Sequence, residues 1–267
     1  MSAAGLGDRA GHGGHGALGP VAAEQRIEEL QRQLALSHQA LEEFTFSVSH
    51  DLRAPLRHVG AYLKIVQEDL GAGVEPAILS HLQTASEAAA QMGRLMDGLL
   101  ELSRAGRAQM QWCDVDMQRL VADVRRQMDF ECAGRQVEWR IAPDIAPVRG
   151  DLALLGQMLV HLLGNALKFT RLAPVAVIEV YARTPKHGWC ELCIRDNGVG
   201  FDPRLQDRLF RVFQRLHSSK QFEGLGVGLA FARLVVERHG GVVRARGDMA
   251  PGCEISLTLP LAAAGAA

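Results

Sequence analysis

The sequence predicts an α+β protein in which an N-terminal helical hairpin forms a dimeric four-helix bundle and is followed by a two-layer α/β sandwich. Apolar residues recur every three or four positions up to about residue 104, which is typical of long amphipathic helices. Beyond about residue 112, helical patterns mix with alternating strand patterns, and several of the strands come late. That order of elements favours a two-layer sandwich.

The composition favours a soluble cytoplasmic protein. The 267 residues, 48% of them apolar, suffice for two domains, and the net charge of -1 gives no reason to expect nucleic acid as a partner. No apolar run of about eighteen residues and no signal-peptide pattern occurs, so we expect no stable membrane insertion. The 5 cysteines are scattered, and Cys190 and Cys193 lack a second pair, so we expect a reducing compartment and no metal site at this CxxC.

The N-terminal part predicts a tail and then a long helix. Residues 1–20 are rich in Gly, Ala and His and should be disordered. Residues 21–48 carry a heptad seam that predicts a coiled-coil signalling helix, and the helix should continue past Pro55 to near Gly71. The seam consists of Ile27, Leu30, Leu34, Leu41, Phe44 and Val48.

A second amphipathic helix is predicted over roughly 76–104. With the first helix it makes a hairpin over 40–106, which we interpret as a dimerisation and phosphotransfer domain. One hairpin cannot bury both its own apolar stripe and the heptad seam. We therefore expect two copies to form a four-helix bundle.

The sandwich domain is predicted over 110–262, after a boundary near 103–109. Its helices should cover 114–130 and 151–168, and an amphipathic helix should follow the glycines at 224–228. Alternating patterns predict strands over 136–141, 176–183, 188–195, 242–246 and 252–259.

The stretch SVSHDLRAPLRH places His50 one turn before a helix-disrupting proline. Pro55 cannot donate to the carbonyl of Asp51, so the helix should loosen or kink there and leave the imidazole exposed. Arg53 and Arg57 lie near the histidine and suggest that a negatively charged group binds there. This stretch alone is equally compatible with a histidine that only fills a surface or core position and has no functional role.

Three polar or glycine-rich stretches interrupt the sandwich: HLLGNALKFT, DNGVGFD and GLGVGLA. Asn165 and Lys168 project together and suit magnesium and phosphate, although either could simply face water. Asp196 could accept a hydrogen bond from an exocyclic amine, or merely cap a tight turn. The glycines at 224, 226 and 228 precede a helix whose first backbone amides would favour binding of phosphate. Glycines before a helix often only allow the chain to turn, so this interpretation stays open.

Together with FTFSVSHDLRAPLRHV, these stretches closely resemble the sensor histidine kinases of bacterial two-component systems, and LFRVFQRLH resembles the phenylalanine box of that family. The resemblance covers roughly residues 25–260 and is strongest to the kinase modules that follow phytochrome-type photosensors. It implies a Bergerat (GHKL-like) ATP-binding fold, ATP and Mg²⁺ as cofactors, a homodimer, and a response regulator receiver domain as partner.

The resemblance also implies a role for each matching residue. His50 would accept the γ-phosphoryl group, with Asp51 hydrogen-bonded to its other ring nitrogen. Asn165 would ligate magnesium and Asp196 would receive the adenine amino group. Lys168 would contact phosphate, Phe169 would lie against adenine, and Gly198 and Gly200 would shape the adenine pocket. Gly224, Gly226 and Gly228 would bracket a lid over the phosphates, and Lys220 would form part of that lid. Phe210 and Phe213 would pack the base of the lid.

Three positions depart from the pattern of the family. His161 stands where an asparagine is more usual, so metal coordination would rest on Asn165. Leu225 replaces a small or hydroxylated residue between two lid glycines. Ala54 replaces the polar residue that orients water for dephosphorylating the regulator, so we expect weak or no phosphatase activity.

Two other functions are compatible with parts of this pattern. A related ATPase clamp would share the asparagine and glycine boxes, but it would not need the histidine hairpin. A non-catalytic scaffold that docks regulators remains open because of His161 and Leu225. No sensor domain is recognised before the heptad seam, so we expect either a separate sensor protein or a longer parent chain.

Overall fold

The computed structural model describes residues 20–70, 74–218, 221–247 and 252–262. The chain divides into two compact units, 1–44 and 45–267, with the boundary inside the first helix. The predicted disordered tail therefore lies almost wholly outside the described residues, as does the turn of the hairpin at 71–73.

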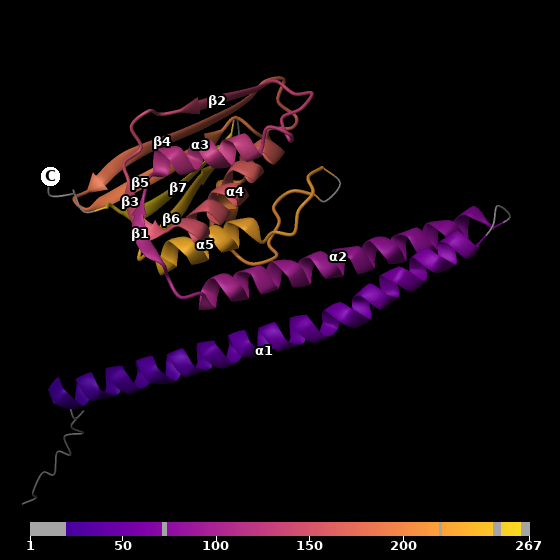
Figure 1. Ribbon diagram of the computed structural model, residues 1–267, viewed down its shortest axis with the longest axis horizontal. Coiled ribbons are helices and arrows are strands. Elements are labelled where there is room, and N and C mark those ends of the chain that lie inside the picture. The colour runs from indigo at the N-terminus through magenta and orange to yellow at the C-terminus, as the bar shows by residue number, and fades with distance from the viewer. Residues whose placement is uncertain (1–19, 71–73, 219–220, 248–251, 263–267) are drawn as a thin grey trace, which may run out of the picture. The chain divides into compact units, whose positions relative to one another are not determined.

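Two long helices form the predicted hairpin. α1 spans Pro20–Asp69 and α2 spans Pro76–Arg107 (Figure 1). α1 continues through Pro55 as one element, so the loosening expected there does not end the helix. Within the second unit the two helices run antiparallel, because the Arg107 guanidinium lies 4.7 Å from the Phe46 ring centroid and Arg53 pairs with Asp97.

The sandwich contains a mixed five-stranded sheet in the order β2-β4-β5-β7-β6. β2 (Val137–Ile141) pairs parallel to β4 (Ala176–Lys186), and the remaining pairs are antiparallel. The other strands are β5 (Trp189–Asp196), β6 (Val243–Gly247) and β7 (Cys253–Pro260). Figure 1 shows α3 (Met117–Gln127), α4 (Leu152–Phe169) and α5 (Gly228–Arg238) on one side of this sheet. A short 3₁₀ helix, η1 (Pro203–Arg208), follows β5.

α4 is the core helix of the sandwich. Eight of its 18 residues are buried, including Leu155, Met158, Leu159 and Leu163, and Phe231 of α5 packs in the same core. Among the residues that the structure describes, α4 is the one helix long and apolar enough to cross a membrane by length and composition. Its buried residues pack against both the sheet and α5, which identifies it instead as the core helix of the folded domain.

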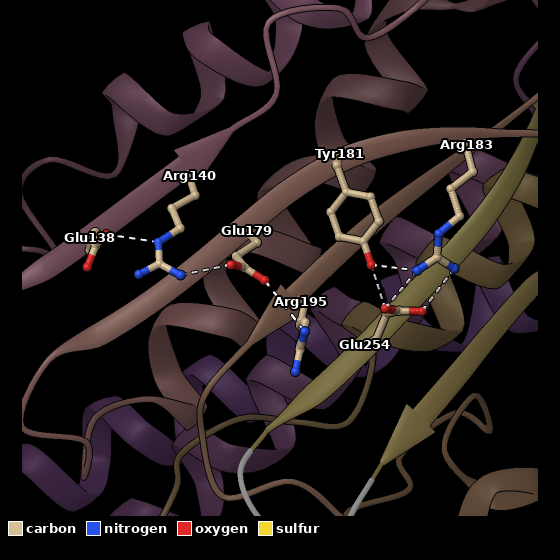
Figure 2. A network of polar contacts seen from close by, with 7 residues as sticks. All are labelled: Glu138, Arg140, Glu179, Tyr181, Arg183, Arg195 and Glu254. Atoms are coloured by element: carbon tan, nitrogen blue, oxygen red, sulfur yellow. Dashed lines mark hydrogen bonds and ion pairs between the residues drawn. The ribbon is translucent and has the colours of Figure 1, made fainter.

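The other face of the sheet is polar and carries alternating charges. Strand register aligns Arg140, Glu179, Arg195 and Glu254 across four neighbouring strands. Figure 2 shows that Arg140 and Arg195 both pair with Glu179, and that Arg183 pairs with Glu254. Glu254 also accepts a 2.6 Å hydrogen bond from the Tyr181 hydroxyl. Opposite charges on neighbouring strands stabilise the register of a sheet, so this face needs no covering layer.

One predicted helix was partly wrong. Residues 112–115 form a strand, β1 (Trp112–Val115), which pairs antiparallel with β3 (Val148–Asp151), so residues 114 and 115 are not helical. α3 begins at Met117 because the Asp116 carboxylate accepts a hydrogen bond from the Arg119 amide and caps the helix. The other predicted helices and strands are confirmed within a few residues at each end.

Candidate active site

A cavity of about 1050 Å³ lies between α2, α4 and the segment that leads into α5. Its volume is at the upper end of the ~300–1,000 Å³ typical of ligand pockets. Eight of the predicted binding residues line it: Asn165, Lys168, Phe169, Asp196, Gly200, Gly224, Gly226 and Gly228. The three separated sequence stretches therefore meet at one site.

The last turn of α4 supplies a cation and an amide. Lys168 Nζ donates to Asn165 Oδ1 at 3.0 Å and lies 4.4 Å from the centroid of the Phe169 ring. Burial lowers the pKa of Lys168, and the nearby Arg215 guanidinium lowers it further. Because the cause is missing hydration and a neighbouring positive charge, an anion bound in the cavity would stabilise the charged lysine.

The end of β5 places a buried carboxyl in the cavity wall. The Asp196 side chain, from a residue 8% exposed, accepts a 2.9 Å hydrogen bond from the Gly198 amide through Oδ1. Burial raises the pKa of Asp196 to about 6. Gly198 does not line the cavity, but a Cβ there would lie 2.5 Å from the Phe169 carbonyl oxygen. Glycine is therefore required for this turn to pack against the end of α4.

The first turn of α5 presents backbone amides without a side-chain cap. The residue before it, Val227, makes no capping hydrogen bond, and Gly228 lines the cavity. Unpaired amides and the helix dipole make such a terminus a favourable place for an anion. Gly226 has a φ of 74°, and a Cβ there would lie 2.5 Å from the Gln214 carbonyl oxygen, so this residue must be glycine.

Three aromatic rings meet at one side of the cavity. The centroids of Phe169, His217 and Phe222 lie 5.2–5.5 Å apart, and His217 Nε2 is 2.9 Å from the Gly200 carbonyl oxygen. Arg215 donates to the Phe222 carbonyl oxygen. The sequence stretch that contains Arg215 and His217 was recognised, but neither residue was assigned to the site. Their place in the phenylalanine box was the available signal.

The predicted lid residues have mixed outcomes. Phe210 is half-buried and packs against the core. Phe213 is 42% exposed and has a φ of 62°, and its amide donates a 2.9 Å hydrogen bond to the Gly226 carbonyl oxygen. The backbone of Phe213 therefore braces the glycine segment. Lys220 lies outside the described residues.

A wall of the cavity comes from α2, which the sequence did not indicate. Gly98 and Glu101 line it, and Gly98 packs directly against Val227. Glu101 accepts a 2.6 Å hydrogen bond from Gln157, and its Oε1 lies 2.8 Å from His161 Nε2. The hydrogen bond from His161 lowers the pKa of Glu101. These contacts join residues about sixty positions apart in the sequence, so no local sequence pattern predicts them.

His50 and Asp51 lie outside the cavity lining, on the exposed surface of α1. His50 Nδ1 is 3.2 Å from Asp51 Oδ1, with the two side chains 70% and 73% exposed. The Phe46 ring, one turn earlier on α1, stacks with the His50 ring, and the two ring centroids lie 6.4 Å apart. Because Asp51 occupies Nδ1, the other ring nitrogen, Nε2, is available to a reacting group.

The donor set at Asn165 fits a magnesium ion held mainly by phosphate. Asn165 has one amide oxygen within the cavity, and this oxygen could meet the ion once Lys168 Nζ, 3.0 Å from it, turns to a phosphate. No group of three or more His, Cys, Asp or Glu residues suited to a metal occurs in the part of the chain that the structure describes. Mg²⁺ usually binds through one or two protein oxygens together with water and substrate phosphates. A dedicated protein cage is therefore not needed.

Comparison with known families matches residues 150–263 to the family described as histidine kinase-, DNA gyrase B-, and HSP90-like ATPases. The chain is also similar to cyanobacterial phytochrome B of a Nostoc species, with 31% identity over 87% of this chain and 31% of that protein. The methanogenesis regulatory histidine kinase FilI of Methanothrix harundinacea is 30% identical over 90% of this chain and 27% of its own length. The chain thus spans 31% and 27% of the length of these two relatives.

The fold is also shared with a solved structure. Full-length ShkA, crystallised in complex with AMPPNP, matches with a TM-score of 0.61 and 24% identity, covering 84% of this chain and 47% of that one. The hairpin followed by a sandwich is therefore an arrangement seen in a known protein.

Proposed function

We propose that the chain is a sensor histidine kinase core of the phytochrome-like type. It would transfer the γ-phosphoryl group of ATP to His50 and then to an aspartate of a response regulator. The coexistence of an exposed histidine on α1 and a nucleotide-sized cavity in one chain supports this proposal most strongly. An ATPase clamp would not need the histidine.

ATP fits the polarity of the cavity. The Asp196 carboxylate would accept a hydrogen bond from the adenine amino group, and the nearby Phe169 ring would lie against the base. Lys168 and the open first turn of α5 would bind the phosphates. An ion-binding role for Asn165 would let Mg²⁺ neutralise phosphate charge.

His50 would act as the nucleophile through Nε2. Asp51, 3.2 Å from Nδ1, would hold the proton on that nitrogen and leave the Nε2 lone pair free. Nε2 bonds to the γ-phosphorus as the bond to the bridging β–γ oxygen breaks, and ADP leaves. Because His50 does not line the cavity, the domains must rearrange before transfer.

The partners would be a second copy of the chain and a receiver domain. The exposed apolar residues of α1 and α2 support the homodimer. A separate sensor protein or a sensor region of a longer chain would supply the signal through the predicted coiled coil. Ala54, exposed one turn after His50, has no polar group to orient a water, so phosphatase activity would be weak or absent.

The decisive experiment measures transfer of labelled γ-phosphate from Mg²⁺-ATP to the wild type, His50→Ala and His58→Ala. His58 is a matched control because it is exposed two turns further along the same helix. We expect acid-labile, alkali-stable label on the wild type and His58→Ala, and none on His50→Ala.

Other results would point to other functions. ATP hydrolysis without label on His50 would favour an ATPase. Nucleotide binding without either activity would favour a scaffold that docks regulators.

A further inference from the structure

His161 occupies a central position between the hairpin and the cavity. It lies one turn before Asn165 on α4 and lines the cavity. Its Nε2 is 2.8 Å from Glu101 Oε1 on α2, and Gln157 donates to the same oxygen. Since a carboxylate accepts hydrogen bonds, the geometry assigns the proton on this contact to His161 Nε2.

The opposite side of the same ring supports the start of α5. A Cβ placed on Gly228 would lie 3.2 Å from His161 Nδ1 and 3.3 Å from its Cβ, so the imidazole packs against the backbone of the first residue of α5. The ring centroid is also 4.9 Å from that of Phe231 in the same helix. His161 therefore contacts α2 on one side and the uncapped turn of α5 on the other.

We propose that His161 is a positioning residue that, held by Glu101 of α2, fixes the first turn of α5 for binding the ATP phosphates. This inference rests on the proposed function and deepens it. It accounts for a histidine at a position where an asparagine was expected, because an imidazole is long enough to reach Glu101 while it still packs on Gly228.

The contacts distinguish this role from direct metal ligation. Nε2 is engaged by Glu101 and is therefore not free to bind an ion, and the ring that carries Nδ1 packs against the start of α5. A positioning role also predicts that Glu101, which lines the cavity from α2, affects phosphate binding through His161 and as strongly as His161 does.

Calorimetric titration of the full chain with Mg²⁺-ATP, and separately with adenosine, tests this role. The variants are Glu101→Ala, His161→Ala and the double variant. Glu87→Ala serves as the control, because Glu87 is an exposed glutamate of α2 that bonds to Gln83. We expect each single variant to weaken ATP binding about tenfold and leave adenosine binding unchanged, and the double variant to be no weaker than either single one.

Conservative variants provide a test that does not depend on how well the alanine variants fold. Gln at position 161 can still donate to Glu101, whereas Asn is too short, so His161→Gln should keep most of the ATP affinity and His161→Asn should lose it. Equal affinities of these two variants would overturn the proposal.

The alanine series has its own contrary outcomes. An effect of His161→Ala without one of Glu101→Ala would indicate a direct ligand, and additive effects would indicate independent residues. Either result overturns the positioning role. A wild type that binds no ATP would instead contradict the proposed function.

Discussion

Asp196 combines a proposed binding role with a cost in stability. Burial raises its pKa from 3.8 to about 6, so unfolding releases a proton between these values. The folded state is therefore favoured below pH 3.8 by this group, and that contribution is lost as the pH rises through 6. At neutral pH the buried charge costs about 3 kcal/mol.

Asp196→Asn should accordingly separate stability from binding. We predict that the variant unfolds at higher denaturant concentration than the wild type at pH 7, with the difference shrinking toward pH 4. It should bind ATP at least a hundredfold more weakly, because the amide no longer offers a carboxylate to the adenine amine. Denaturant titrations at several pH values and calorimetry with ATP measure both effects. A variant that is less stable than the wild type at pH 7 would contradict the assigned cause of the pKa shift.

A second prediction concerns Ala54 and the dephosphorylation of the regulator. Ala54 is exposed on α1, one turn after His50, so a longer side chain there meets no steric barrier in the single chain. We predict that Ala54→Thr leaves autophosphorylation within a few-fold of the wild type and raises dephosphorylation of the phosphorylated regulator at least tenfold. Ala61→Thr, two turns further along the helix and also exposed, is the control. Rapid phosphatase activity of the unaltered protein would refute the expectation.

At the scale of elements, the glycine segment before α5 depends on one conformation. Gly226 has a φ of 74° and approaches the Gln214 backbone, so Gly226→Ala adds both left-handed strain and a clash. We predict loss of ATP binding by more than tenfold. Gly134→Ala is a matched control, because Gly134 has a φ of 76° but no atom within 4 Å of the added Cβ. It should cost about 1 kcal/mol of stability and leave ATP affinity unchanged. Equal ATP affinities of the two variants would show that the clash is unimportant.

The junction of α4 and α5 depends on a neutral histidine. His239 donates from Nδ1 to the Val235 carbonyl oxygen at 2.7 Å, and its Nε2 accepts from the Asp151 amide at 3.0 Å. Burial lowers the pKa of His239 below its ordinary 6.5, and Asp151 and Arg238 are the charged groups that act on it. Unfolding therefore takes up a proton at acid pH, so stability present above pH 6.5 is lost as the pH falls.

His239→Gln removes this titration. We predict that the difference in unfolding free energy between wild type and His239→Gln, measured by urea titration, is largest at pH 7.5 and shrinks toward pH 5.5. A difference that is constant over this range would show that His239 does not titrate between the two states.

The elements that the sequence predicted are those whose pattern is local. Periodic apolar residues predict one buried face in each of α1, α2 and α4. Alternating apolar residues do the same in β5 and β7. β1 and β3 have only four residues each, and they exist because they pair across some thirty-five positions. The site shows the same division: Asn165 and Lys168 share one helical turn and were predicted, whereas the contact of Glu101 with His161 depends on how α2 packs on α4.

At the scale of the molecule, one chain leaves an apolar surface uncovered on the hairpin. Val59, Tyr62, Ile65 and Val66 of α1 are 42–68% exposed, and Ile78 and Leu79 of α2 are 46% and 42% exposed. Exposed apolar residues that recur along two paired helices are what a four-helix bundle would bury. None of these six residues lines the cavity. Dimerisation and nucleotide binding should therefore be separable.

Val59→Glu combined with Val66→Glu should separate them. We predict that light scattering during size-exclusion chromatography finds a dimer for the wild type and a monomer for the double variant, because burying two carboxylates in the bundle is unfavourable. ATP affinity should remain within a few-fold of the wild type, and the melting temperature should lose its dependence on protein concentration. Val242→Glu, at an exposed position of the sandwich, should leave the dimer intact. A double variant that remains dimeric would place the interface elsewhere, and one that loses ATP binding would show that the cavity needs the partner chain.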